Sequence, residues 1–253
     1  MILSDFHIHS TFSDGKLSIP EIVDFFGSRG FGAIAITDHI CQENNFVGKA
    51  AHYLGKTLTR ATFPVYKEIL KSEGERAWDQ YQMRLIPGFE LTKNALTNHR
   101  SAHVLALGVT DWISADLEIP EMSKAIRSQG GLSIAAHPLS PHAVQNKPFY
   151  LWDHRRELES EFDAWEVTYH ATLLKDVMNS SLKKLASSDF HKPFHMTSWK
   201  TMVDSELHPQ AILQAIKKQD LRFFFYEEEK EVRNSVNIFQ ADWIQGMALA
   251  IPS

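Results

Sequence analysis

The sequence predicts an α/β fold, a distorted (β/α)7 barrel with its functional site at the C-terminal ends of the strands. Two observations predict this class. Short apolar segments alternate with helical segments along most of the 253 residues. Acidic or histidine side chains follow nearly every apolar segment, where barrel proteins gather their chemistry. The length suits one large domain.

Seven apolar segments are expected to form the strands. The first is followed by an amphipathic helix from Pro20 to Arg29, which Ser18 can cap and Gly30 can end. Further helices are expected at 64–83, 119–129 and 172–182. Strands that alternate with helices predict parallel βαβ units. The expected strands are residues 2–6, 31–37, 84–91, 102–109, 132–136, 163–168 and 184–188.

Two stretches interrupt this alternation. Residues 40–83 are too long for a simple crossover, so we expect an inserted helical excursion, for which a lid over the barrel mouth is one use. Residues 227–253 open with three glutamates and are expected to be a C-terminal tail outside a domain of residues 1–226.

Composition limits the class of protein. The apolar fraction of 43% and the charged fraction of 23% are those of an ordinary soluble protein, and the net charge of −5 gives no basic footprint for nucleic acid. The single cysteine, Cys41, excludes an internal disulfide and suits a reducing compartment. No signal-peptide pattern and no apolar run of ~18 residues is present, so we expect a cytoplasmic protein without a membrane segment.

The polar residues at the strand ends carry the functional prediction. His7 and His9 are two residues apart on an extended segment, so they point to the same side, and neutral imidazole is the commonest protein ligand for transition metals. His103 is the exception, because it begins its strand. The other acids and histidines at strand ends are Asp14, His39, Glu90, His137, Asp189 and His191.

Each of these residues also has an ordinary structural explanation. Asp14 lies in a Ser-Asp-Gly turn sequence, His39 belongs to a potential helix cap, and Glu90 suits a buried ion pair. Together, these explanations require an acid or histidine at nearly every strand end by coincidence. One metal site accounts for all of them, so we favour a metal site.

The motifs DFHIHS, SDG, TDH, GFE, AHP and SDFH, in this order, resemble those of the PHP (polymerase and histidinol phosphatase) family of metal-dependent phosphoesterases. The resemblance runs from Asp5 to about His191. It implies a distorted seven-stranded barrel that binds two to three divalent ions. By position, the implied ligands are His7, His9 and Asp189 for the first ion, Glu90 as a bridge, His103 and His137 for the second ion, and Asp14, His39 and His191 for the third.

The resemblance also implies roles around these ligands. Asp5 and Asp38 would accept the free N–H of ligand histidines and set their tautomers. Mixed imidazole and carboxylate ligands suit zinc, manganese or iron. Two such ions can share a hydroxide that attacks phosphorus, and three ions with their ligands leave a charge of roughly +2, which suits a phosphomonoester dianion. The predicted catalytic residues are Glu90, Asp189 and His191.

Substrate recognition is less defined by the sequence. Arg155, Lys192 and Glu166 are the predicted substrate-binding residues. A solvent-facing charge is the alternative for the two cations. For Glu166, the alternatives are a contact with a group behind the ligands and a core salt bridge. The leaving-group acid stays open among His99, His170 and His195.

The expected function is hydrolysis of a small-molecule phosphate ester, with a phosphomonoester favoured. Three alternatives stay open: a histidinol-phosphate phosphatase, a nuclease-like phosphodiesterase, and a non-catalytic metal-binding scaffold. The expected partner is a small phosphate ester, and neither a membrane nor nucleic acid is expected to bind. The sequence predicts no oligomeric state.

Overall fold

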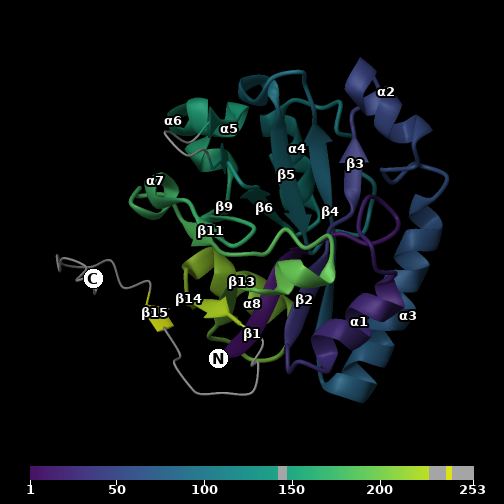
Figure 1. Cartoon of the computed structure of the whole chain (residues 1–253), viewed down its shortest axis with the longest axis vertical. Coiled ribbons are helices and arrows are strands. Elements are labelled where there is room, and N and C mark those ends of the chain that lie inside the picture. The colour runs from purple at the N-terminus through teal and green to yellow at the C-terminus, as the bar shows by residue number, and fades with distance from the viewer. Residues whose placement is uncertain (142–146, 228–237, 241–253) are drawn as a thin grey trace.

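The computed structural model describes residues 1–141, 147–227 and 238–240. An 11-stranded sheet curls into a nearly closed barrel with helices on its outside (Figure 1), which confirms the predicted fold class. The order of strands in the sheet is β12 (Lys184–Leu185), β9 (Ala164–Glu166), β6 (Leu132–Ala135), β5 (Ala102–Leu107), β4 (Arg84–Lys93), β2 (Ala33–Ile36), β1 (Ile2–Ile8), β13 (Ser198–Val203), β14 (Leu221–Tyr226) and β15 (Ile238–Gln240). The strand β3 (His39–Cys41) pairs with β4.

The seven predicted segments form the wall of the barrel. The segment that follows β12 returns to β1, where the Phe190 N–H donates to the His7 carbonyl at 2.9 Å and the His9 N–H donates to the Phe190 carbonyl at 2.8 Å. These bonds bring the two ends of the wall together. The wall strands are β1 (Ile2–Ile8), β2 (Ala33–Ile36), β4 (Arg84–Lys93), β5 (Ala102–Leu107), β6 (Leu132–Ala135), β9 (Ala164–Glu166) and β12 (Lys184–Leu185).

The strand β5 runs against both of its neighbours, which corrects the expected series of parallel units. It pairs antiparallel with β4 and with β6, and a loop with one 3-10 turn, η1 (Asn98–Arg100), joins β4 to β5 in place of a crossover helix. Because β5 is reversed, its first residues lie beside the last residues of β4, and His103 pairs with Thr92. His103 therefore lies at the same edge as the C-terminal strand ends.

The helices form the outer layer. Ser18 caps α1 (Ile19–Gly27) in a capping box with Glu21, as its sequence predicts, and the buried face of α1 packs on the barrel. Of the helix expected at 172–182, only α7 (Lys175–Met178) forms, because a hairpin of β10 (Thr168–Tyr169) and β11 (Thr172–Leu173) fills the first part. The other long helices are α3 (Phe63–Tyr81), α4 (Ile119–Ser128) and α8 (Pro209–Lys218).

The stretch 40–83 contributes to the helical layer. It contains most of β3 (His39–Cys41), then α2 (Phe46–Tyr53) and α3. The helix α3 lies beside α1 on the outside of the barrel (Figure 1), where the Arg76 guanidinium donates to the Pro20 carbonyl at 3.0 Å. This half of the stretch is therefore not a lid.

Short elements complete the described chain. The strands β13 (Ser198–Val203) and β14 (Leu221–Tyr226) extend the sheet from β1 in antiparallel fashion, and β15 (Ile238–Gln240) follows them. Most of the predicted tail, residues 228–237 and 241–253, lies outside the described residues. The remaining elements are β7 (Leu139–Ser140), β8 (Lys147–Pro148), α5 (Tyr150–Asp153), α6 (Arg155–Leu158), η2 (Glu159–Glu161), α7 (Lys175–Met178) and η3 (Pro193–Met196).

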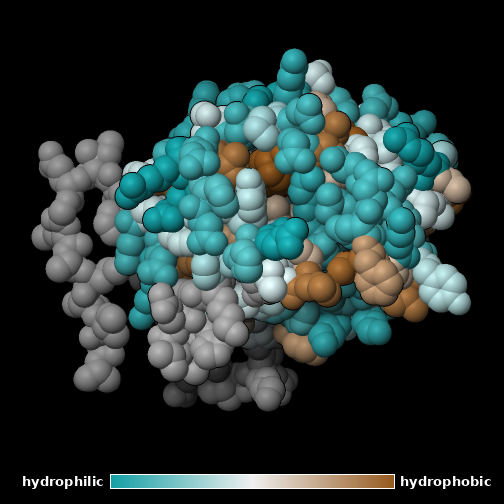
Figure 2. Space-filling view, turned by 90° about the horizontal axis from the view of Figure 1, so that it is seen from above, coloured by the Kyte–Doolittle hydropathy of each residue, from teal (hydrophilic) through white to brown (hydrophobic). Residues whose placement is uncertain are grey.

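The face of the molecule shown in Figure 2 is mostly polar. Seen from above, apolar side chains form small separate patches between polar ones (Figure 2). Within the described part of the chain, no helix combines the length and the apolar composition that a bilayer crossing requires.

Candidate metal centre

All nine predicted ligands lie together at one end of the barrel. Their ligand atoms form four overlapping groups, and the atoms of each group lie within 4.8 Å of one another. The groups are His7–His9–Glu90, His7–His137–Asp189, Glu90–His103–His137 and His9–Asp14–His39–His191. Residues from six strands of the wall, or from the segments that follow them, therefore meet at this end.

Glu90 stands between these groups. Its Oε2 lies 3.7 Å from His7 Nε2, 3.6 Å from His9 Nε2 and 2.7 Å from His39 Nδ1. Its Oε1 lies 2.9 Å from His103 Nδ1 and 3.5 Å from His137 Nε2. The two oxygens of this fully buried carboxylate thus face two different sets of histidines, which is the arrangement a bridging ligand requires.

The spacing around Asp189 fits ligation of a common ion. Asp189 Oδ1 lies 3.4 Å from the Nε2 atoms of both His7 and His9. Ligand atoms that surround one tetrahedral ion at about 2.1 Å lie about 3.4 Å apart. In the third group, Asp14 Oδ1 lies 3.1 Å from His191 Nε2 and 3.6 Å from His39 Nε2, so the same spacing recurs.

Buried polar atoms without a hydrogen-bond partner are concentrated at this site. Of the ten such side-chain atoms among the described residues, six belong to predicted ligands: His7 Nε2, both ring nitrogens of His9, Asp14 Oδ1, Glu90 Oε2 and His137 Nδ1. Each unsatisfied buried polar group costs about 1–3 kcal/mol. Divalent ions would satisfy most of these atoms, so the residues present fit a centre of two or three ions.

The electrostatics of the ligands favour cation binding. Burial opposes ionisation of Glu90, but His103, His39 and His7 outweigh it and hold the pKa of this carboxyl well below its usual value. Asp189 behaves in the same way. Burial, followed by the neighbouring His39 and His191, lowers the pKa of His9 to about 3. Ionised carboxylates and a neutral imidazole are the forms that bind metal ions.

Two of the ligands have an unusual backbone conformation. His137 has a φ of 23° and Asp189 a φ of 52°, and residues other than glycine seldom adopt positive φ. Such positions persist only where neighbouring groups hold them. The Glu166 carboxylate accepts the His137 N–H at 2.8 Å, and the Asp5 carboxylate accepts the N–H of Ser188, next to Asp189, at 3.1 Å.

Asp5 and Asp38 do not contact the rings of ligand histidines, so the roles that the resemblance implied for them are wrong. Asp38 accepts the backbone N–H of Ser10 at 2.8 Å and its hydroxyl at 2.6 Å, which fixes the loop before Asp14. Asp5 pairs with Lys200 at 2.9 Å, and both side chains are fully buried. The two aspartates therefore support the ligand-bearing loops.

Other residues orient the ligand rings. The Glu166 carboxylate accepts from His7 Nδ1, and the side-chain amide oxygen of Asn94 accepts from His103 Nε2 at 2.9 Å. The Thr92 hydroxyl lies 2.8 Å from His39 Nδ1. The sequence analysis did not single out Thr92 or Asn94, although Thr92 follows Glu90 by two residues on β4 and so lies on the same side of the strand, and Asn94 follows the end of β4.

A cavity of about 530 Å³ opens above the ligands. Lys192, a predicted substrate-binding residue, lines it, and so do His170 and His195. Residues 40–83 contribute nothing to its lining among the described residues, so this cavity gives no support to their use as a lid.

Three other predicted residues do not line this cavity. The Arg155 guanidinium lies 4.5 Å from the Trp152 ring centroid and donates to the Trp152 carbonyl, and His99 lies on the exposed turn η1. Glu166 is only 1% exposed and contacts His7 and His137. This geometry gives no support to the predicted contacts of Arg155 and Glu166 with a substrate. The Arg155 side chain faces Trp152, and the Glu166 side chain is enclosed below the predicted ligands.

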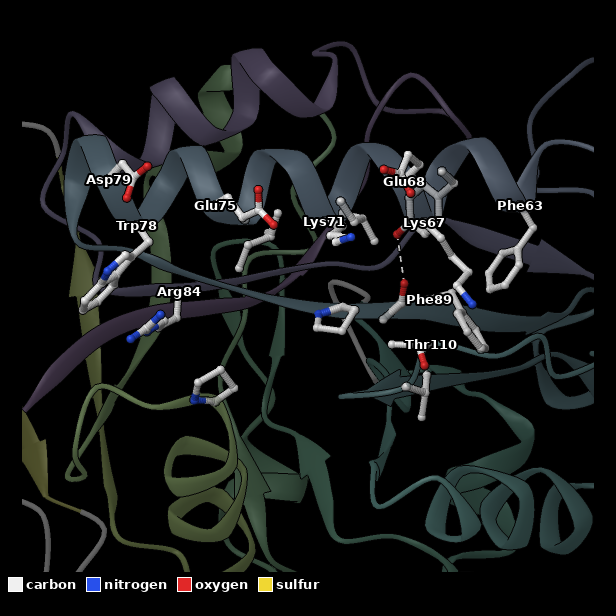
Figure 3. A pocket seen from close by; sticks show the side chains of 18 residues that line it. Phe63, Lys67, Glu68, Lys71, Glu75, Trp78, Asp79, Arg84, Phe89 and Thr110 are labelled. Carbon is white, nitrogen blue, oxygen red and sulfur yellow. Dashed lines mark hydrogen bonds between the residues drawn. The ribbon is translucent and has the colours of Figure 1, made fainter.

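A second cavity, of about 680 Å³, lies outside the barrel between α3 and β4 (Figure 3). The Arg84 guanidinium stacks 3.4 Å from the Trp78 ring at one end, and the Tyr66 hydroxyl donates to the Gly88 carbonyl at 2.9 Å. Although this cavity is larger, no histidine or cysteine is among its described lining residues. The convergent titratable groups are at the strand ends, so the candidate site lies there.

Solved structures share this fold. A two-domain protein from Bacteroides vulgatus ATCC 8482, described as containing a predicted PHP-like metal-dependent phosphoesterase, is 20% identical, with a TM-score of 0.65 over 89% of this chain and 65% of that one. The chain thus spans about two thirds of that neighbour's length. An amidohydrolase from Chromobacterium violaceum, solved with bound sulfate and no metal, is 15% identical, with a TM-score of 0.51 over 86% of this chain and 96% of that one.

The family comparison covers most of the chain. No curated protein matches the sequence. The model of the PHP domain matches residues 5–185, which include seven of the nine ligands and end just before Asp189 and His191. The chain therefore belongs to the PHP domain family.

Proposed function

We propose that this protein is a metal-dependent phosphoesterase that hydrolyses a small phosphate ester, with phosphomonoesters favoured. One observation carries the proposal: the buried Glu90 carboxylate directs its two oxygens to two different sets of histidines beneath an open cavity. The PHP family and the description of the Bacteroides neighbour support the same chemistry. A cavity of about 530 Å³ suits a small molecule.

The chemistry that two or three divalent ions supply when bound is activation of water and neutralisation of phosphoryl oxygens. Residues of the chain prepare the site for it. Glu90 and Asp189 stay ionised at neutral pH, so they hold positive charge below the phosphate. His170 and His195 line the cavity without belonging to a ligand group. Burial, followed by the neighbouring His170, lowers the pKa of His195 to about 4, so His170 is the better candidate to donate a proton to a leaving oxygen.

A panel of phosphomonoesters and phosphodiesters, assayed with manganese or zinc, tests this proposal. We expect release of phosphate from monoesters such as 4-nitrophenyl phosphate, and slower cleavage of bis(4-nitrophenyl) phosphate. Faster cleavage of the diester would favour the nuclease-like alternative. If metal-loaded protein cleaves no ester of the panel, the non-catalytic scaffold becomes the better account.

The cytoplasmic location belongs to this proposal as well, since Cys41 is buried and unpaired.

A further inference from the structure

Two lysines line the cavity immediately beside the third ligand group. Lys16 follows Asp14 by two residues, and Lys192 directly follows His191. The backbone N–H of Lys16 donates to the His191 carbonyl at 2.8 Å. This bond joins the two segments that carry the lysines. The two lysine side chains therefore leave the backbone at neighbouring points on one side of the cavity.

The turn that carries Lys16 has a fixed position. The Gly15 N–H donates to the Ser10 carbonyl at 3.0 Å, and a Cβ atom on Gly15 would lie 2.1 Å from the His9 carbonyl oxygen. No side chain fits at residue 15, because the turn lies directly against the end of β1. The backbone of Lys16 is therefore held against the strand that carries His7 and His9.

Neither lysine pairs with an acidic side chain within the described part of the chain. The lysines that do form ion pairs there are Lys67, Lys93, Lys200 and Lys217. Lys192 Nζ lies 4.5 Å from the Phe194 ring centroid, and the acids of the described cavity lining, Asp14 and Asp189, are both candidate ligands. Each ammonium group can therefore gain a charge-assisted contact from a bound anion.

We propose that Lys16 and Lys192 bind a second anionic group of the substrate, a carboxylate or a further phosphate. This inference rests on the proposed phosphoesterase activity, in which the reacting phosphate faces the ligand groups. The ligand group that contains His137 has aromatic neighbours in place of lysines. The Phe149 and Tyr169 ring centroids each lie 5.7 Å from the centroid of the His137 ring. The preferred substrate is therefore a small phosphomonoester with an additional negative charge on the part that faces Lys16 and Lys192.

Matched substrates test this assignment. Phosphoglycolate and ethyl phosphate differ only in a carboxylate that replaces a methyl group, and 3-phosphoglycerate and glycerol 3-phosphate form a second pair. We expect kcat/KM to be at least about tenfold higher for the carboxylate member of each pair, because each ammonium gains a charge-assisted contact. In the Lys16→Met/Lys192→Met double variant, this ratio should fall to about one. Lys218→Met, at an exposed lysine on α8, is the control and should keep the wild-type ratio.

The outcomes separate the two proposals. A loss that affects both members of a pair equally would assign the lysines to the reacting phosphate and overturn the second-anion subsite, as would a wild-type ratio near one. If the protein cleaves no phosphate ester, the proposed function fails. Calorimetric binding of phosphoglycolate and ethyl phosphate to metal-loaded protein then still decides the subsite, because equal affinities would reject it.

Discussion

Both carboxylate oxygens of Glu166 lie close to Nδ1 of His7, at 3.1 and 3.2 Å. The contact leaves Nε2 of His7 facing Glu90 and Asp189. The same carboxylate accepts the N–H of His137. One enclosed glutamate therefore sets the ring orientation of one candidate ligand and the backbone of another, which is how residues behind metal ligands raise metal affinity.

Replacement of Glu166 tests this relationship. Glu166→Gln keeps the size of the side chain but removes the charge that holds the His7 N–H. We expect metal affinity to fall about 10–100-fold, as measured by calorimetric titration against a competing chelator. Glu157→Gln, at an exposed glutamate, is the matched control. Equal affinities of Glu166→Gln and wild type would reject the orienting role.

The bridging position of Glu90 predicts a larger effect. Glu90→Ala removes the carboxylate between two sets of histidines, so we expect loss of at least one bound ion and a fall in phosphatase activity of about 100-fold or more. Metal analysis and kinetics on the same sample measure both effects, and far-UV circular dichroism checks the fold. Full metal content with retained activity would contradict a bridging role.

Metal removal should destabilise the protein. Six buried ligand atoms lack hydrogen-bond partners, so bound ions should stabilise the folded state strongly. An ion present at 1,000 times its dissociation constant contributes about 4 kcal/mol. In a domain of this size, that corresponds to a fall in Tm of about 8–16 °C after chelation. Calorimetry before chelation, after it and after reloading measures the change, and an unaltered Tm after verified metal removal would count against these ligands.

The buried pair of Lys200 and Asp5 predicts a stability effect beneath the site. Lys200→Met leaves the Asp5 carboxylate buried without its cation, which costs about 3–5 kcal/mol. The double variant Asp5→Asn/Lys200→Met should recover part of this loss, because the unpaired charge is gone. Urea denaturation measures both variants. A single variant as stable as wild type would show that the pair contributes little.

Local sequence pattern predicted the strands and brought the ligands to one edge, because each ligand adjoins an apolar strand. It did not predict the direction of β5. The apolar pattern of a strand is the same in both directions, so His103 looked misplaced until its pairing with Thr92 was known. The hairpin at 168–173 was missed for a related reason. Each of its strands has two residues, which are too few to show the alternation of apolar and polar residues that indicates a strand.

The sequence also did not predict which residues contact each other across the barrel. Glu166 and His7 are 159 residues apart, and Asp5 and Ser188 are 183 residues apart. Spacing along the chain places a side chain on one face of a strand, but it does not say which distant loop that side chain supports. The resemblance therefore supplied the ligands, while the roles of Asp5 and Asp38 depended on tertiary packing.

The central claim is that several ions share this one cluster of histidines and carboxylates. Metal analysis by inductively coupled plasma mass spectrometry on the purified protein, with the protein concentration determined by amino-acid analysis, tests it most directly. We predict two to three equivalents of zinc, manganese or iron per chain. One equivalent or none, after incubation with each metal and removal of the excess, would contradict a multinuclear centre.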